Sequence, residues 1–220
     1  MKLIAFSAVV VALASSPAVL AGTNGFYVPT FRGQDGSQAA YWESFTVGIG
    51  APGNVANVGN DTTSILTQTQ PGAMVLGSGN IYNQALISEF TVSYSGGGPV
   101  GQVVFQARTS GTELDYGSVS LNYGAGALTA VRTELDRTSF GTPGVPGPQG
   151  FNVSSAWQWD LSTYNVSSYT LSFKAAEPSL SFDSATLDTQ VVPEPGTWAL
   201  AGLGGVAMML AGWRRTRCSK

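Results

Sequence analysis

EFTVSYS, residues 89–95, and YTLSFK, residues 169–174, are the stretches that decide the fold class of this chain. Apolar and polar residues alternate strictly in both. In the first stretch Phe90, Val92 and Tyr94 therefore point to one side of an extended chain, and the residues between them point to the other. Alternation with a period of two predicts β-strands that have one buried face and one face in water.

Outward from these two stretches, similar short segments recur and are separated by turn residues. Turns are expected at 96–99 and 124–126, and the Pro/Gly-rich segment 142–150 is expected to be a loop. The pattern predicts an all-β protein with a single antiparallel β-sandwich, jelly-roll-like, over residues 22–190. Amyloid-like matrix structure is the alternative, but the turns are too irregular for stacked repeats. The expected strands are 40–47, 64–69, 85–95, 100–109, 117–123, 128–135, 156–161, 168–175 and 179–189.

Composition excludes several classes of chemistry. The chain has no histidine, which removes Ser-His-Asp and Cys-His catalysis and histidine-based zinc sites. It also has no G-x-x-x-x-G-K-[ST] loop for phosphates. Residues 22–192 carry five basic and twelve acidic residues, a net charge of −7, so nucleic acid is not an expected partner. The single cysteine, Cys218, lies outside this body, which therefore cannot contain a disulfide.

The N-terminus has the pattern of a targeting segment. Residues 1–21 combine Lys2, an apolar run and the small residues that a signal peptidase requires before its cleavage site. A secretory signal peptide that is cut after Ala21 is therefore expected.

The C-terminal tail has three parts in a fixed order: a proline-rich motif, an uncharged apolar stretch at residues 197–213, and a basic end. A helix of the apolar stretch would be about 25 Å long, near the short limit for a transmembrane helix. The basic end places the C-terminus in the cytoplasm and residues 22–190 outside. The motif residues are Val192, Pro193, Glu194, Pro195 and Gly196, and the basic stop residues are Arg214, Arg215 and Arg217.

This tail, residues 191–220, resembles the PEP-CTERM sorting signal of Gram-negative bacteria. The resemblance implies that an exosortase, a membrane-embedded enzyme, recognises the tail, removes the helix and releases or attaches the exported body. The precursor would be anchored in the cell membrane, and the final location would be the cell surface or the extracellular matrix, within the exopolysaccharide of a biofilm. A GPI signal is the competing interpretation, and the basic residues after the apolar stretch argue against it.

The body has a second, looser resemblance. Segments 105–116, 157–161 and 179–189 are similar to the lectin-like or galactose-binding-like sandwiches of other PEP-CTERM proteins. No binding residue is carried over from that similarity.

Two copies of Thr-Glu-Leu-Asp form the first candidate site. In a strand Glu113 and Asp115 point to one side, and Glu134 and Asp136 do the same in the second copy. If these strands pair, the four carboxylates are a candidate Ca²⁺ site or a candidate acid pair of a glycoside hydrolase. The alternative is a structural role, in which neighbouring arginines neutralise the acids across the strands.

The second candidate site is a pair of indoles. Trp157 and Trp159 are two residues apart in an expected strand, so they share one face. An exposed pair would be a platform for stacking on sugar rings, whereas a buried pair is typical of a sandwich core. Both interpretations remain open from the sequence.

Together these patterns predict a non-enzymatic exported protein with a role in adhesion or polysaccharide contact. No cofactor is expected, apart from the candidate Ca²⁺. The expected partners are exosortase, the membrane before processing, and exopolysaccharide. A secreted glycoside hydrolase that uses the four carboxylates, and a purely structural matrix protein, are the alternatives.

Overall fold

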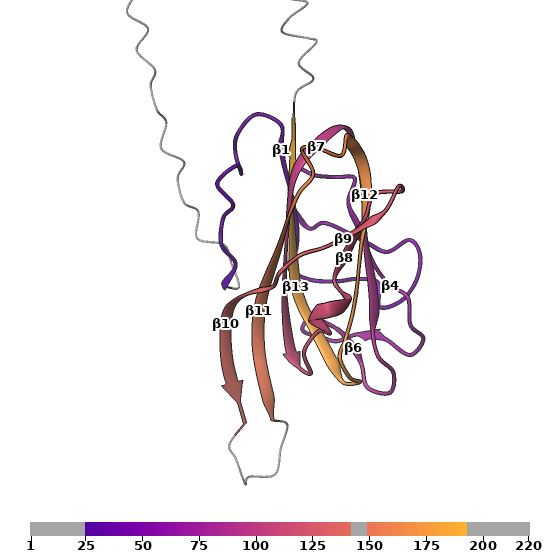
Figure 1. The fold of residues 1–220 in the computed structure, drawn as a ribbon. Coiled ribbons are helices and arrows are strands. Elements are labelled where there is room, and N and C mark those ends of the chain that lie inside the picture. The colour runs from indigo at the N-terminus through magenta and orange to yellow at the C-terminus, as the bar shows by residue number, and fades with distance from the viewer. Residues whose placement is uncertain (1–24, 142–148, 193–220) are drawn as a thin grey trace, which may run out of the picture.

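The structure is a computed structural model that describes residues 25–141 and 149–192. This part of the chain forms thirteen antiparallel strands and a short 3-10 helix, η2 (Tyr116–Ser118). Backbone hydrogen bonds connect the strands continuously, and the resulting sheet folds into two facing layers (Figure 1). Within the described part no helix is long and apolar enough to cross a membrane. The expected signal peptide, residues 1–21, and the expected membrane helix, residues 197–213, lie outside it.

Strand β7 (Glu89–Gly111) belongs to both layers. Residues 89–95 pair with strands β4 and β12, whereas residues 102–111 pair with strands β11 and β13. The sequence predicted that a turn at 96–99 would separate two strands, and this prediction was wrong. The ladder continues through a bend instead, because glycines such as Gly97 (φ +76°) let the backbone change direction without a side chain in the way.

The two layers are named here for the strand that each places beside β7. The β13 layer contains, in order, β3 (Val58–Gly59), β1 (Ser37–Trp42), β13 (Leu180–Val191), the second half of β7, β11 (Gly150–Asp160) and β10 (Thr133–Phe140). The β12 layer contains β2 (Asn54–Val55), β4 (Ile65–Gln68), the first half of β7, β12 (Val166–Lys174), β8 (Ser120–Asn122) and β9 (Ala127–Thr129). The start of β13 also pairs with β6 (Ile81–Asn83), which pairs with β5 (Met74–Val75).

This arrangement confirms the all-β class and the single antiparallel sandwich, jelly-roll-like, that the sequence predicted. The first long strand, β1, pairs with the last, β13, so segments from opposite ends of the body meet in one layer. The alternating stretches that began the sequence analysis are the first half of β7 and most of β12, and they lie side by side.

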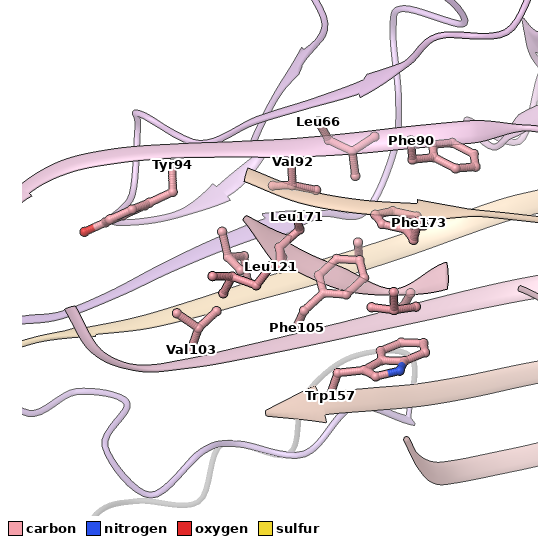
Figure 2. Packing of buried hydrophobic residues seen from close by; sticks show 14 of the residues in the cluster. Leu66, Phe90, Val92, Tyr94, Val103, Phe105, Leu121, Trp157, Leu171 and Phe173 are labelled. Carbon is pink, nitrogen blue, oxygen red and sulfur yellow. The ribbon is translucent and has the colours of Figure 1, made fainter. Parts of the chain in front are cut away.

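Aromatic rings join the two layers through the core. The Phe182 ring of the β13 layer lies 4.6 Å, centroid to centroid, from the Phe90 ring of the β12 layer. Phe105 and Phe173 make a second contact between layers at 4.9 Å. Figure 2 shows Phe105 and Phe173 pointing toward one another from facing strands. Since each buried ring removes a large apolar area from water, this cluster is a main source of the stability of the fold.

The N-terminal strap, residues 25–36, covers the outer face of the β13 layer (Figure 1). The backbone N–H of Tyr27 donates to Gln106 Oε1 at 2.9 Å, and Gln106 Nε2 donates back to the Tyr27 carbonyl at 2.9 Å. Gln106 is fully buried although its side chain points away from the core, because the strap lies over it. The outer face of the β13 layer therefore carries a polar side chain at Gln106, and the strap covers it there.

We expect Phe182→Ala to destabilise the sandwich strongly, because it removes a ring that contacts Phe90 and Phe173 of the β12 layer and also Phe45. The expected loss in the free energy of unfolding is about 3–5 kcal/mol, measured by denaturant titration with tryptophan fluorescence. Val131→Ala is the matched control, since Val131 is 90% exposed, and it should change stability by less than about 0.5 kcal/mol. Equal effects of the two substitutions would contradict this account of the core.

Candidate functional site

The fold continues without a linker into the sorting motif. The backbone N–H of Val191, the last residue of β13, donates to the Gly36 carbonyl at 2.9 Å. The next residue, Val192, donates its N–H to the Pro99 carbonyl at 2.7 Å. Val192 is the first residue of the predicted motif, so the motif begins inside the folded body. Residues 193–196 lie outside the described part of the chain.

A buried ion pair fastens the strap to β13. Arg32 donates from Nε to Asp188 Oδ1 at 2.5 Å and from Nη2 to Oδ2 at 2.6 Å, and the Asp188 side chain is 0% exposed. Burial raises the pKa of the Asp188 carboxyl, although the hydrogen bonds from Arg32 oppose this effect. Burial lowers the pKa of Arg32, but its bonds to Asp188 outweigh burial, and the pKa is raised overall. The guanidinium is therefore charged throughout the physiological range, and its bidentate geometry favours an ionised partner.

The predicted acids meet two arginines at the edge of the β13 layer. Arg137 Nη1 lies 2.6 Å from Glu113 Oε1, and Arg137 Nη2 lies 3.1 Å from Glu134 Oε2. Arg132 Nη2 contacts the same Glu134 oxygen at 2.6 Å, and its guanidinium carbon lies 3.7 Å from the centre of the Tyr116 ring. The Tyr116 hydroxyl in turn donates to Glu113. We call these five residues the arginine–glutamate cluster.

The electrostatics of this cluster favour charged carboxylates. Hydrogen bonds from Arg137 lower the pKa of Glu113, with burial opposing and Tyr116 assisting. Hydrogen bonds from Arg137 and then Arg132 lower the pKa of Glu134. Burial and the hydrogen bond to Glu113 raise the pKa of Tyr116 to about 12. The cluster is therefore a network of ion pairs at neutral pH.

The four predicted carboxylates do not converge, and the candidate Ca²⁺ site is corrected accordingly. Asp115 lies beside Lys174, with 3.7 Å between Oδ2 and Nζ. A β-bulge separates Glu134 and Asp136, which pair with consecutive residues of β11 and so point to opposite faces of the layer. Among residues 25–141 and 149–192 no group of three or more acids, cysteines or histidines is placed to hold a metal ion.

The candidate glycan platform at Trp157 and Trp159 is also corrected. Their side chains point into the core and are 1% and 3% exposed. Trp157 packs 5.9 Å, ring to ring, from Phe105, and Trp159 donates its indole N–H to the Leu128 carbonyl at 3.1 Å. Neither indole offers a face to a sugar ring, because both fill space between the two layers.

A cleft of about 360 Å³ lies at the opposite end of the sandwich from Val192. It is bounded by residues in or next to β6, β7, β10, β11 and β13, and most of its lining residues carry a hydroxyl group or an aromatic ring. Its lining residues are Tyr82, Ser110, Gly111, Thr112, Phe140, Gln149, Ser179 and Ser181.

A polar network supports one wall of this cleft. Ser110 Oγ lies 2.6 Å from Asp183 Oδ2 and 2.5 Å from Asn152 Oδ1. Asn80 Nδ2 donates to the other Asp183 oxygen at 2.6 Å, and Ser181 Oγ lies 3.1 Å from that oxygen. These contacts fix the hydroxyl of Ser110, which lines the cleft.

Sequence reasoning missed the cleft. Its residues come from four strands, and Asp183 sits at a β-bulge where the register between β13 and β7 shifts. From alternation alone, Asp183 is expected to be an ordinary residue of a regular strand. The pattern does not indicate that its side chain meets those of Asn80, Ser110 and Asn152. The only local signal was the clustering of serine and asparagine near expected strand ends.

The comparisons with known proteins identify the tail. The family described as the PEP-CTERM protein-sorting motif matches residues 191–215, which confirms the motif that the sequence analysis recognised. No curated protein and no solved structure matches the chain. The chain therefore carries the sorting signal of an exported protein, made as a membrane-anchored precursor and processed by an exosortase.

The lowered pKa values of Glu113 and Glu134 predict a loss of stability in acid. A carboxylate whose folded pKa is lowered contributes stability above its unfolded pKa, and this contribution is lost as pH falls through the folded pKa. We therefore expect Arg137→Gln to lower the thermal midpoint by a few degrees at pH 7, with the difference from wild type shrinking between about pH 5 and pH 3. Lys174→Gln, which removes an exposed pair, is the control and should show little pH-dependent difference. A constant offset for Arg137→Gln at every pH would contradict the assignment.

Proposed function

We propose that the sandwich is a non-enzymatic polysaccharide-binding body, displayed at the surface or in the extracellular matrix of a Gram-negative bacterium. The sorting motif at residues 191–215 supports export and exosortase processing, and the body is what is exported. The observation that carries the binding role is the cleft opposite Val192, where hydroxyl-bearing and aromatic side chains line one concave surface.

The chemistry of the cleft suits a sugar better than a charged ligand. The half-buried rings of Tyr82 and Phe140 offer apolar surface to the C–H faces of a pyranose. Ser110, Thr112 and Ser181 supply hydroxyl oxygens that can accept hydrogen bonds from a sugar, while their own hydrogens are donated to Asp183 or Asn152, to the Pro178 carbonyl and to Asp183, respectively. Small-ligand sites in proteins generally combine apolar walls with a few fixed polar groups of this kind.

The arginine–glutamate cluster argues against a hydrolase. A general acid for glycoside hydrolysis needs a raised pKa, so that it holds a proton near neutral pH. Arg137 instead lowers the pKa values of both Glu113 and Glu134. Each of these carboxylates also has its oxygens occupied by arginine, which leaves neither ready to protonate a glycosidic oxygen.

We expect Tyr82→Ala to weaken glycan binding at least about tenfold, since it removes one aromatic wall of the cleft. The measurement is a glycan array followed by titration calorimetry on a bound polysaccharide, with the full chain in detergent. Tyr164→Ala is the matched control, because Tyr164 is exposed but lies at the other end of the sandwich.

Three outcomes decide between the functions. Binding that is lost in Tyr82→Ala and retained in Tyr164→Ala supports the cleft. No binding to any polysaccharide on the array supports a purely structural matrix protein and overturns the proposal. Cleavage of a bound glycan that stops in Glu113→Gln and Glu134→Gln supports the hydrolase and overturns it as well.

The sorting signal predicts the composition of the mature protein. Removal of the apolar stretch by an exosortase should leave a surface or matrix form that lacks Trp213, and removal of the signal peptide should leave a form that begins near Gly22. Intact mass spectrometry of the protein recovered from the producing cells measures both ends. A mature form that retains Trp213 would count against exosortase processing.

A further inference from the structure

We propose that one end of the sandwich lies against the lipid headgroups while the protein is a membrane-anchored precursor. This exit end consists of the last residues of β13 and the turns beside them. The inference goes beyond polysaccharide binding and rests only on anchoring by the C-terminal tail. With the turns at residues 33–36, 123–126 and 161–165 we count the bend of β7 at residues 96–99, and these four segments are called the turns of the exit end.

Contacts between these turns establish that they share one end. Val191 and Val192 bond to Gly36 and Pro99, which brings the first two turns to the end of β13. The N–H of Leu161 donates to the Gly101 carbonyl at 2.7 Å, which places the turn at residues 161–165 at the same end. The turn at residues 123–126 lies beside the turn at residues 161–165, because the rings of Tyr123 and Tyr164 meet edge to face, with centroids 5.2 Å apart. In Figure 1 the yellow end of β13 and the bend of β7 lie together at the top of the sandwich.

The tether to the membrane is short. Val192 is still hydrogen-bonded within the fold, and only four residues separate it from Thr197, where the apolar stretch begins. A fully extended chain covers at most about 18 Å over this interval. Headgroups occupy roughly 5–7 Å on each side of the hydrocarbon core. The exit end therefore stays within about 12 Å of the headgroup surface, far less than the length of β13.

The chemistry of the exit end suits this position. Asp35 is the only charged residue within the four turns, and Asp160, which accepts a hydrogen bond from the Ser162 N–H, borders the last of them; the body as a whole carries a net charge of −7. An acidic surface would be repelled by anionic headgroups, so an end with few carboxylates suits the position nearest the membrane. Tyr164 is 41% exposed and presents an aromatic ring with a hydroxyl, the type of side chain that is enriched at membrane interfaces.

The same geometry directs the cleft away from the membrane. Ser181 lines the cleft at the start of β13, and Val191 ends the strand at the exit end. Val191 lies ten positions after Ser181 in an extended strand, a distance of roughly 33 Å. The cleft is therefore presented outward even before the tail is processed.

The experiment uses the full chain with Cys218→Ser, which removes the only native cysteine. Single cysteines are introduced as Thr163→Cys at the exit end and Glu177→Cys at the opposite end, both exposed, and are labelled with an environment-sensitive fluorophore. Each protein is reconstituted in phosphatidylethanolamine and phosphatidylglycerol vesicles that contain headgroup-spin-labelled lipid. Circular dichroism verifies that both variants keep their β-structure.

We expect the label at residue 163 to lose most of its fluorescence to the spin-labelled headgroups and the label at 177 to lose almost none. Inserting a flexible Gly/Ser segment of about twenty residues between Val192 and Pro193 should restore the signal at 163, because the tether no longer holds the exit end. Equal quenching at both sites, no quenching at 163, or quenching at 163 that survives the insertion would overturn the proposal. None of these results depends on whether the cleft binds a polysaccharide, so the two proposals fail separately.

Discussion

Strand β7 is the constraint on which the sandwich depends, because its two halves lie in different layers and the strands beside them pair directly with it. The bend at 96–99 turns one strand into the hinge of two layers. Phe90 precedes that bend and Phe105 follows it, and each reaches a ring in the opposite layer. Because both halves belong to one strand, the bend holds the two layers at the distance at which their aromatic rings make contact. A flexible linker between separate strands would leave this alignment to packing alone.

The two ends of the sandwich differ in charge and in shape. Glycine-rich turns with almost no charge surround Val192, from which the sorting motif leaves. The opposite end carries the cleft, whose rings and hydroxyl groups come from strand ends that β7 and β13 bring together. The arginine–glutamate cluster lies near the same end and consists of paired charges. The sorting motif and the cleft, to which we assign the proposed binding role, are therefore separated along the length of one strand.

The sequence predicts the features of the fold that depend on local patterns, and it misses those that depend on contacts between distant segments. Alternation located the first half of β7 and β12, because a period of two is a local property. Strands such as β2 and β5, two residues long, exist only through tertiary pairing and left no such pattern. The bulge between Glu134 and Asp136 reversed the face of one acid, and the four carboxylates separated as a result. Trp157 and Trp159 shared a face as expected, but spacing cannot tell which face is buried.

The Arg32–Asp188 pair has a consequence for the order in which the chain assembles. The strap and β1, at the start of the described chain, find their partners on β13, the last strand, which is synthesised about 140 residues later. The strap and β1 cannot pair with β13 until β13 has been synthesised, so this part of the β13 layer forms late. The β13 layer is therefore complete only when residues 180–191 are available to pair with β1 and β7.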